Sequence, residues 1–175
     1  MNIMNTNAAL AQDFDQDLDT KQYLSFVLAE EEYAVDILCV QEIRSWEKVT
    51  AIPNTPDYVT GVINLRGVVV PVIDLRIRFG LAKAEFNANT VIVVVNIEGN
   101  IEGKSGDRVI GMVVDAVSDV YNFAAEVIGN TPDLGGAIST EFVKGLATVD
   151  DKMIILLDID LLINIEILEV GSEKY

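Results

Sequence analysis

Short runs of hydrophobic residues, separated by polar turns, follow one another along most of the chain. The first run, at residues 23–28, begins abruptly after a polar and acidic stretch. A polar turn at residues 29–32 separates it from a second run at residues 33–36. Runs of this length between turn residues are typical of β-strands, so we expect a hairpin over residues 23–36.

Two further hairpins follow the same pattern. Residues 61–75 contain two apolar arms around Gly67, and Pro71, which has no N–H, predicts an edge position or an irregularity there. Residues 55–61 predict one or two helical turns, because a threonine can cap them, a proline follows it and a glycine ends the segment. A later run at residues 91–95 is expected to return at residues 109–114.

The second half of the chain repeats the first. Residues 55–61 match residues 139–145 in kind at all but two positions, and residues 68–75 lie over residues 152–159 with the same offset of 84. A chance likeness of apolar strands would explain the shared valines but not the shared cap, acid, aromatic residue and glycine. An internal repeat predicts two similar β-rich units that pack together and leave a groove for a partner at their junction.

The earlier parts of the halves correspond more loosely. Val40-Gln41-Glu42-Ile43 follows a valine–aspartate pair, as does Val117-Ser118-Asp119-Val120. Both segments come after a predicted hairpin, so we expect them to occupy equivalent places in the two units.

Composition allows a sizeable core and limits the partners. Half of the 175 residues are hydrophobic, but the longest apolar run, residues 91–95, is far too short to span a bilayer. Lysine and arginine number 12 against 28 aspartates and glutamates, a formal charge of −16. This charge repels phosphate backbones and anionic lipids, so we expect neither nucleic acid nor direct membrane contact.

The first ten residues lack the features of a secretory signal, so we expect a cytoplasmic protein with a flexible acidic tail at residues 1–20.

Residues suited to catalysis or metal binding are scarce. The chain has no histidine, and its one cysteine, Cys39, excludes an internal disulfide; we expect Cys39 to be a small core residue. Residues 99–105 resemble a P-loop but have one residue too few between the glycines, and residues 13–24 lack the glycine and glutamate of a calcium-binding EF-hand loop. We therefore expect no metal and no other cofactor.

Two aspartates end equivalent strands. Capping of neighbouring backbone N–H groups accounts for both Asp74 and Asp158. An enzyme acting through Asp74, Asp115 or Asp158 is a second interpretation, which metal-dependent turnover lost in Asp74→Ala would favour. A double barrel that binds a small ligand is a third, which an apolar cavity holding a copurified compound would favour.

Arg66 stands in an otherwise uncharged run, residues 61–70. A cation beside so much apolar surface usually has a carboxylate partner, and Glu42 is our candidate. The alternative is a mobile arginine on an exposed turn.

Three segments resemble the CheW family: residues 31–38 with 40–44, residues 52–56 leading to 61–67, and residues 70–76. The most specific parts are Asn64-Leu65-Arg66-Gly67 and Val70-Pro71-Val72-Ile73-Asp74-Leu75. Residues 113–120 and 139–142 fit as well, so the resemblance covers about residues 21–165 in family order.

The resemblance implies a mainly β fold. We expect two five-stranded SH3-like β-barrel subdomains, related by a pseudo-twofold repeat, with few short helical turns and a shared hydrophobic junction. The CheW-like domain would span residues 21–175, with subdomain 1 at about 21–88 and subdomain 2 at about 89–165, and an exchange of strands at their ends is allowed for.

The resemblance also implies a function and a site. The protein would be a non-catalytic adaptor that binds the regulatory domain of the histidine kinase CheA and the cytoplasmic tip of methyl-accepting chemoreceptors, within membrane-associated receptor arrays. Glu42 and Arg66 would form an ion pair, and kinase contacts would use exposed barrel ends. By similarity the receptor-binding groove would include Val40, Glu42, Arg66, Val91, Val117 and Val120, and the structural glycines would be Gly61, Gly67, Gly111 and Gly145.

Two details qualify the resemblance. The hairpin between Asn96 and Gly111 is longer than the family usually needs. A CheA regulatory domain would follow a kinase ATP-binding domain and CheV would add a receiver domain, and neither fits in 175 residues, so we expect a free-standing adaptor.

Overall fold

The computed structural model describes residues 20–81, 85–101, 104–129 and 142–162. Strands dominate, as the hydrophobic pattern predicts, and the acidic tail predicted at residues 1–20 lies outside the described residues except for Thr20. The elements run in the order β1 (Thr20–Leu28), β2 (Glu31–Asp36), η1 (Ile37–Cys39), β3 (Val40–Ser45), β4 (Val59–Leu65), β5 (Val68–Asp74), α2 (Leu75–Arg78), β6 (Val91–Ile101), β7 (Lys104–Val114), β8 (Ala116–Ala124), η2 (Ala125–Val127), β9 (Val143–Val149) and β10 (Lys152–Leu157).

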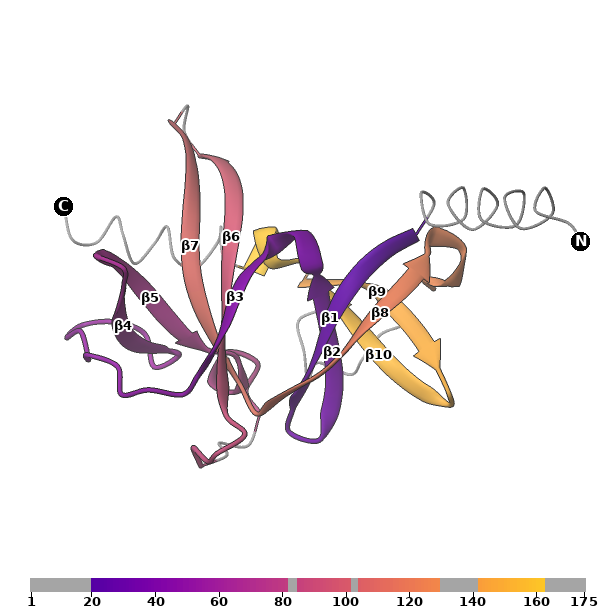
Figure 1. Cartoon of the computed structure of the whole chain (residues 1–175), viewed down its shortest axis with the longest axis horizontal. Coiled ribbons are helices and arrows are strands. Elements are labelled where there is room, and N and C mark those ends of the chain that lie inside the picture. The colour runs from indigo at the N-terminus through magenta and orange to yellow at the C-terminus, as the bar shows by residue number, and fades with distance from the viewer. Residues whose placement is uncertain (1–19, 82–84, 102–103, 130–141, 163–175) are drawn as a thin grey trace, which may run out of the picture.

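The strands form two five-stranded sheets (Figure 1). Sheet A has the order β8-β1-β2-β10-β9, and sheet B has the order β3-β6-β7-β5-β4. Hairpin β1–β2 of the first half therefore completes the sheet of β8 to β10, while β6–β7 of the second half completes the sheet of β3 to β5. Each sheet takes strands from both halves of the chain rather than from residues 21–88 or 89–165 alone.

The two sheets are copies of one arrangement, which confirms the predicted fold class. Strands β4 and β9 begin 84 residues apart, as do β5 and β10. The amide of Asp74 donates to the carbonyl of Tyr58, and the amide of Asp158 donates to the carbonyl of Phe142. In each sheet one pair of neighbours is parallel, β5 with β7 and β10 with β2. The subdomains are SH3-like but open: isolated bridges bring the chain after β3 to β4 and the chain after β8 to β9.

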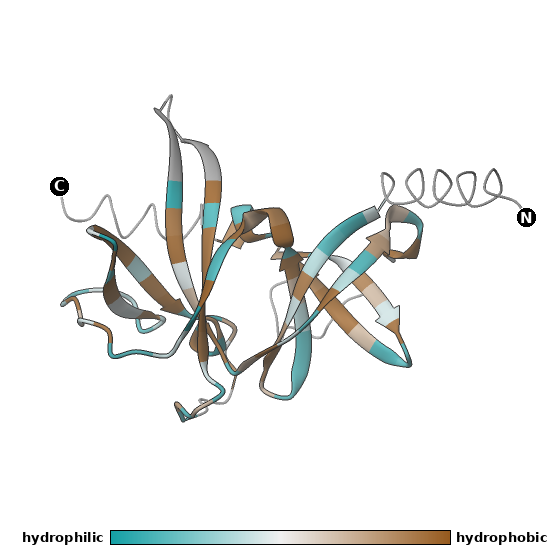
Figure 2. Cartoon of the chain, in the orientation of Figure 1, coloured by the Kyte–Doolittle hydropathy of each residue, from teal (hydrophilic) through white to brown (hydrophobic). Residues whose placement is uncertain are grey.

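Three hydrophobic cores follow from this arrangement. Figure 2 shows that hydrophobic residues recur along the strands of both sheets. One core belongs to sheet B and includes Ile92 and Val94, and a second belongs to sheet A and includes Phe123 and Ile154. The third and largest takes residues from both sheets and is the hydrophobic junction that the sequence predicted. Its members are Leu24, Phe26, Leu28, Tyr33, Val35, Ile73, Leu75, Phe79, Val93, Val95, Ile97, Ile110, Met112, Val114, Phe142, Val143, Leu157, Ile159 and Leu162.

The helical turns predicted at residues 55–61 are wrong. Strand β4 already begins at Val59, and the Thr55 hydroxyl donates to the carbonyl of Ile52 instead of capping a helix. Gly61 lies at a bulge and approaches Thr50 so closely that a Cβ atom there would lie 2.2 Å from the Thr50 carbonyl oxygen. The glycine therefore marks a close backbone contact rather than a helix end.

Two other expectations concern strand ends. Strand β5 lies inside sheet B, but its ladder with β7 covers only Val72 to Asp74, so Pro71 sits just outside it. The long hairpin loop expected between Asn96 and Gly111 is instead mostly strand, because β6 and β7 stay paired as far as Ile101 and Lys104 (Figure 1).

Candidate functional site

A bulge on β8, an edge strand of sheet A, sets which of its side chains face the junction. Val120 pairs with Leu24 and Val117 pairs with Phe26, so β8 has one residue more than β1 between these pairs. Leu24 and Phe26 both belong to the shared core. Val117 and Val120 therefore face the same side of the sheet although they are three residues apart.

Ser25 stabilises this bulge from the neighbouring strand. Its buried hydroxyl donates to the carbonyl of Asp119 at 3.1 Å and accepts from the amide of the same residue at 3.0 Å. Both backbone groups that the bulge removes from the ladder at this position are thereby satisfied.

Strand β3, an edge strand of sheet B, carries the matching bulge. Val40 pairs with Val95 and Ile43 pairs with Val93, and both partners belong to the shared core. Val40 and Ile43 thus face the junction, whereas Glu42 pairs with the intervening residue of β6 and faces the other way. Sequence analysis placed Glu42 beside Val40 and missed Ile43, although Ile43 matches Val120 in the repeat.

The two edge strands therefore present equivalent apolar pairs. Val40 and Val117 are half-buried and pack against the shared core. Ile43 is 45% exposed and Val120 is 47% exposed, so each pair has one anchored and one accessible side chain. Val91, at the start of β6, also packs against the shared core and pairs with Ser45 at the end of β3.

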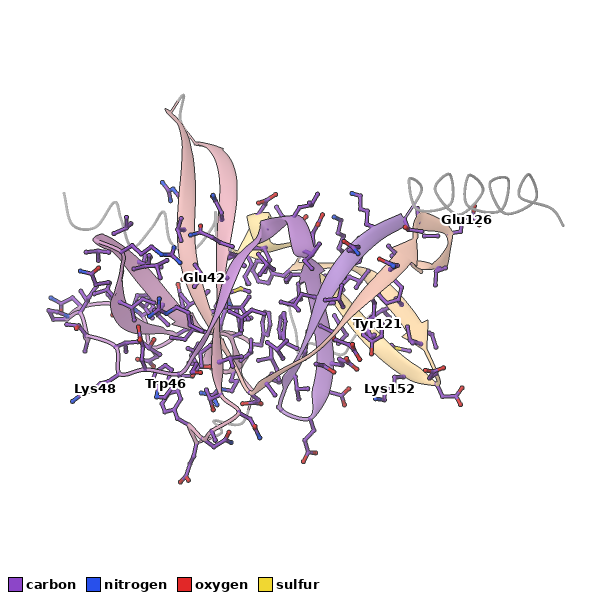
Figure 3. The ribbon with its side chains drawn as sticks, viewed as in Figure 1. Glu42, Trp46, Lys48, Tyr121, Glu126 and Lys152 are labelled. Atoms are coloured by element: carbon purple, nitrogen blue, oxygen red, sulfur yellow. The ribbon has the colours of Figure 1, made fainter. Side chains whose placement is uncertain are left out.

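Glu42 meets Arg66 on the other face of β3. The Arg66 Nη2 atom lies 2.7 Å from Glu42 Oε2, with 71% of the arginine side chain and 21% of the glutamate side chain exposed. Arg44 Nη1 lies 3.5 Å from Glu42 Oε1, so two guanidinium groups flank one carboxylate. Figure 3 shows Glu42 in the group of strands that contains β3.

The turn between β4 and β5 aims Arg66 at this carboxylate. Arg66 and Gly67 both have positive φ angles, 53° and 87°, as a tight hairpin turn requires. The Asn64 side chain accepts a hydrogen bond from the Gly67 amide at 2.8 Å and fixes the turn. A Cβ at Gly67 would meet nothing within 4 Å, so this glycine serves the turn and not packing.

The remaining predicted glycines lie at close contacts. A Cβ at Gly111 would lie 2.8 Å from Ile92 Cγ2, and a Cβ at Gly145 would lie 2.5 Å from Ile128 Cγ2. Both positions belong to the packing of the sheets and not to the exposed surface of β3 or β8.

Asp74 and Asp158 both accept backbone hydrogen bonds, from Arg76 and Leu161 respectively. Asp74 has a second role that sequence analysis missed, because its carboxylate also pairs with the fully buried guanidinium of Arg76 at 2.7 Å. Arg76 also pairs with a second carboxylate, that of Asp115, whose Oδ1 lies 2.9 Å from Arg76 Nη1. The hydrogen bonds that the Arg76 guanidinium donates to the Asp74 carboxylate are the main reason that the pKa of Arg76 is raised.

Cys39 is partly buried rather than a core residue. It lines a pocket of about 400 Å³ together with Leu38, Asn96 and Asp160. Burial raises the pKa of the Cys39 thiol, and the nearby acids Asp36 and Asp160 raise it further. The thiol is therefore protonated and weakly nucleophilic at neutral pH.

Within the described ranges, no three His, Cys, Asp or Glu side chains gather where they could hold a metal ion. None of the helices described is long and apolar enough to cross a bilayer.

These features define a double SH3-like domain with apolar edge-strand positions around a shared junction and one exposed ion pair. Residues 22–166 match the model of the CheW-like domain. The chain is 45% identical over 146 residues to a chemotaxis protein CheW of Klebsiella aerogenes, covering 83% of each chain. It is 37% identical over 142 residues to a probable chemotaxis protein CheW of Rhizobium etli, covering 81% of this chain and 86% of the other.

A solved structure agrees with these matches. The scaffolding protein TtCheW of Thermoanaerobacter tengcongensis superposes with a TM-score of 0.69 at 40% identity, over 79% of this chain and 84% of the other. The chain belongs to the CheW-like domain family, and with it to a class of non-catalytic chemotaxis scaffold proteins.

Proposed function

We propose that this protein couples methyl-accepting chemoreceptors to the histidine kinase CheA by binding the receptors' cytoplasmic tip and the kinase's regulatory domain. The observation that carries the proposal is the equivalent presentation of Val40 with Ile43 and Val117 with Val120 on two edge strands, beside the exposed Arg66–Glu42 pair. Apolar anchors bordered by one ion pair suit an amphipathic helix laid into a groove.

The ion pair supports recognition because the fold itself does not require it. The repeat places Asp119 at the position of Glu42 and Asp150 at the position of Arg66. The second subdomain adopts the same strand arrangement with two acids there. The strand arrangement therefore does not depend on Arg66, which is available to contact a binding partner. At these equivalent positions the first subdomain carries an ion pair and the second carries two acids, so their surfaces differ in charge.

Coupling of a receptor to the kinase requires more than holding the two proteins together. A receptor shifts the kinase between active and inactive states only if the contacts through the adaptor differ in free energy between those states. The protein would work in the cytoplasm, recruited to receptor arrays at the membrane, and would hold kinase and receptor in fixed register.

Binding of both partners at once tests this proposal. A labelled cytoplasmic receptor fragment is titrated with this protein, with and without saturating CheA regulatory domain, by fluorescence anisotropy. The proposal expects receptor binding in both titrations and a larger complex when the kinase domain is present. Binding of neither partner, or mutually exclusive binding, contradicts it.

A further inference from the structure

Four side chains from separate segments form one continuous row. The Trp46 ring, directly after β3, stacks on the Phe86 ring with centroids 3.9 Å apart and planes 1° apart. Arg76 Cζ lies 5.1 Å from the centroid of the Phe86 ring. The guanidinium of Arg76 then pairs with Asp115, which directly precedes β8. The row therefore begins at the end of β3 and ends at the start of β8.

The middle of the row is fixed. Arg76 is 0% exposed, and its Nε and Nη2 both donate to Asp74, at 2.9 and 2.7 Å. The second oxygen of Asp115 accepts from the Ala29 amide at 2.8 Å, which ties the row to the β1–β2 turn of sheet A. Moving this buried guanidinium away from its carboxylates would leave buried charges unpaired, and its planar fork fixes the direction of each hydrogen bond.

Val91 lies beside both ends of the row. The amide of Trp46 donates to the carbonyl of Thr90 at 3.0 Å, next to Val91. Val91 itself pairs with Val114, the residue before Asp115. The row thus connects three of the segments that carry the proposed receptor surface: β3, the start of β6 and β8.

We propose that Arg76, through Phe86 and Asp115, is a positioning residue of the receptor-binding surface that sets the place of β8 relative to β3. This inference rests on the proposed function. Phe86 is 40% exposed, so its stacking on Trp46 adds little to a hydrophobic core. The Phe86 ring instead connects the buried Arg76 guanidinium to Trp46 at the end of β3. Arg76 is buried and does not contact the receptor itself; it acts through the strands whose positions it fixes.

Phe86→Leu and Asp115→Asn are the test variants, and Asp151→Asn, on the exposed turn after β9, is the matched control. Phe86→Leu leaves every buried charge paired, so it carries the test if Asp115→Asn does not fold. For each variant we would measure affinity for the receptor fragment, affinity for the CheA regulatory domain, and the emission of Trp46, the single tryptophan.

Both variants should weaken receptor binding by about 3- to 30-fold and leave kinase binding unchanged, with the control like wild type. Asp115→Asn should also alter Trp46 emission in the folded protein. Equal loss of both affinities would assign the row a general structural role, and unchanged receptor affinity in both folded variants would likewise overturn the inference. Failure of the wild-type protein to bind the receptor fragment would instead count against the proposed function.

Discussion

Arg66 and Glu42, 24 residues apart in the chain, join opposite edges of sheet B, with Arg66 Nη2 2.7 Å from Glu42 Oε2. Glu42 lies on the edge strand β3, and Arg66 lies on the hairpin that includes the other edge strand, β4. The pair therefore spans the open side of the barrel, where the bridge between Thr50 and Val62 also connects the chain after β3 to β4.

Arg66→Glu should lower the affinity for the receptor fragment by about tenfold, which is about 1.4 kcal/mol. The substitution places two carboxylates together and removes the exposed cation. Because exposed ion pairs contribute at most about 1 kcal/mol, the melting temperature should change little. Lys152→Glu makes the same charge change on the β9–β10 hairpin and is the control. Unchanged receptor affinity in Arg66→Glu would show that the receptor-binding site is wrongly assigned.

Two glycines separate the effect of steric contact from that of backbone conformation. Gly61→Ala should destabilise the protein by about 2–5 kcal/mol, since its Cβ would meet the Thr50 carbonyl at a positive φ angle. Gly67→Ala, in open space at φ 87°, should cost only about 1–2 kcal/mol. Urea denaturation of both variants measures the difference. Equal losses would mean that the contact at Thr50 relaxes freely.

Alkaline pH should destabilise the protein through Tyr33. Burial in the shared core raises the pKa of Tyr33 from 10.0 to about 12. Between these values the unfolded chain loses the phenol proton while the folded protein keeps it, so stability is full below pH 10 and falls as pH rises. The decrease in the free energy of unfolding from this group should be about 2–3 kcal/mol. Urea denaturation between pH 9 and 12 checks this, and an equally steep decrease in Tyr33→Phe would contradict it.

The two ion-paired arginines should differ strongly in their effect on stability. Arg76→Met leaves Asp74 buried without its cation and should cost about 3–5 kcal/mol, whereas Arg66→Met should cost at most about 1 kcal/mol. Both variants remove one guanidinium, but Arg76 is fully buried and pairs with Asp74 and Asp115, whereas Arg66 is mostly exposed and pairs with Glu42. Thermal unfolding compares them directly. A similar small loss in both would show that Asp74 regains water when Arg76 is removed.

Much of the fold could be predicted because it is encoded locally and twice. The run around Gly67 and its copy 84 residues later each form a hairpin with neighbouring strands. Sheet membership could not be predicted in the same way. Hydrophobic alternation marks a strand but not its partner, so nothing local indicates that β1 and β2 pair with strands from the second half.

The arrangement of the candidate site residues could be predicted only in part. Glu42 and Arg66 stand out as charges among apolar residues, but the bulges that turn Ile43 toward the junction have no signature in β3 itself. Comparison of Ile43 with Val120 in the repeat is the signal that could have identified it. The burial of Arg76 was missed because its short helix α2 resembles an exposed basic turn, and because one of its two carboxylate partners, Asp115, is 39 residues away.

The central claim is that this protein brings the kinase under receptor control. The most direct measurement is the rate of CheA autophosphorylation with a receptor signalling fragment, in the presence and absence of this protein. The account predicts that the rate responds to the receptor fragment only when the protein is present, and less so with Arg66→Glu. A rate that is the same with and without the protein would contradict the coupling function.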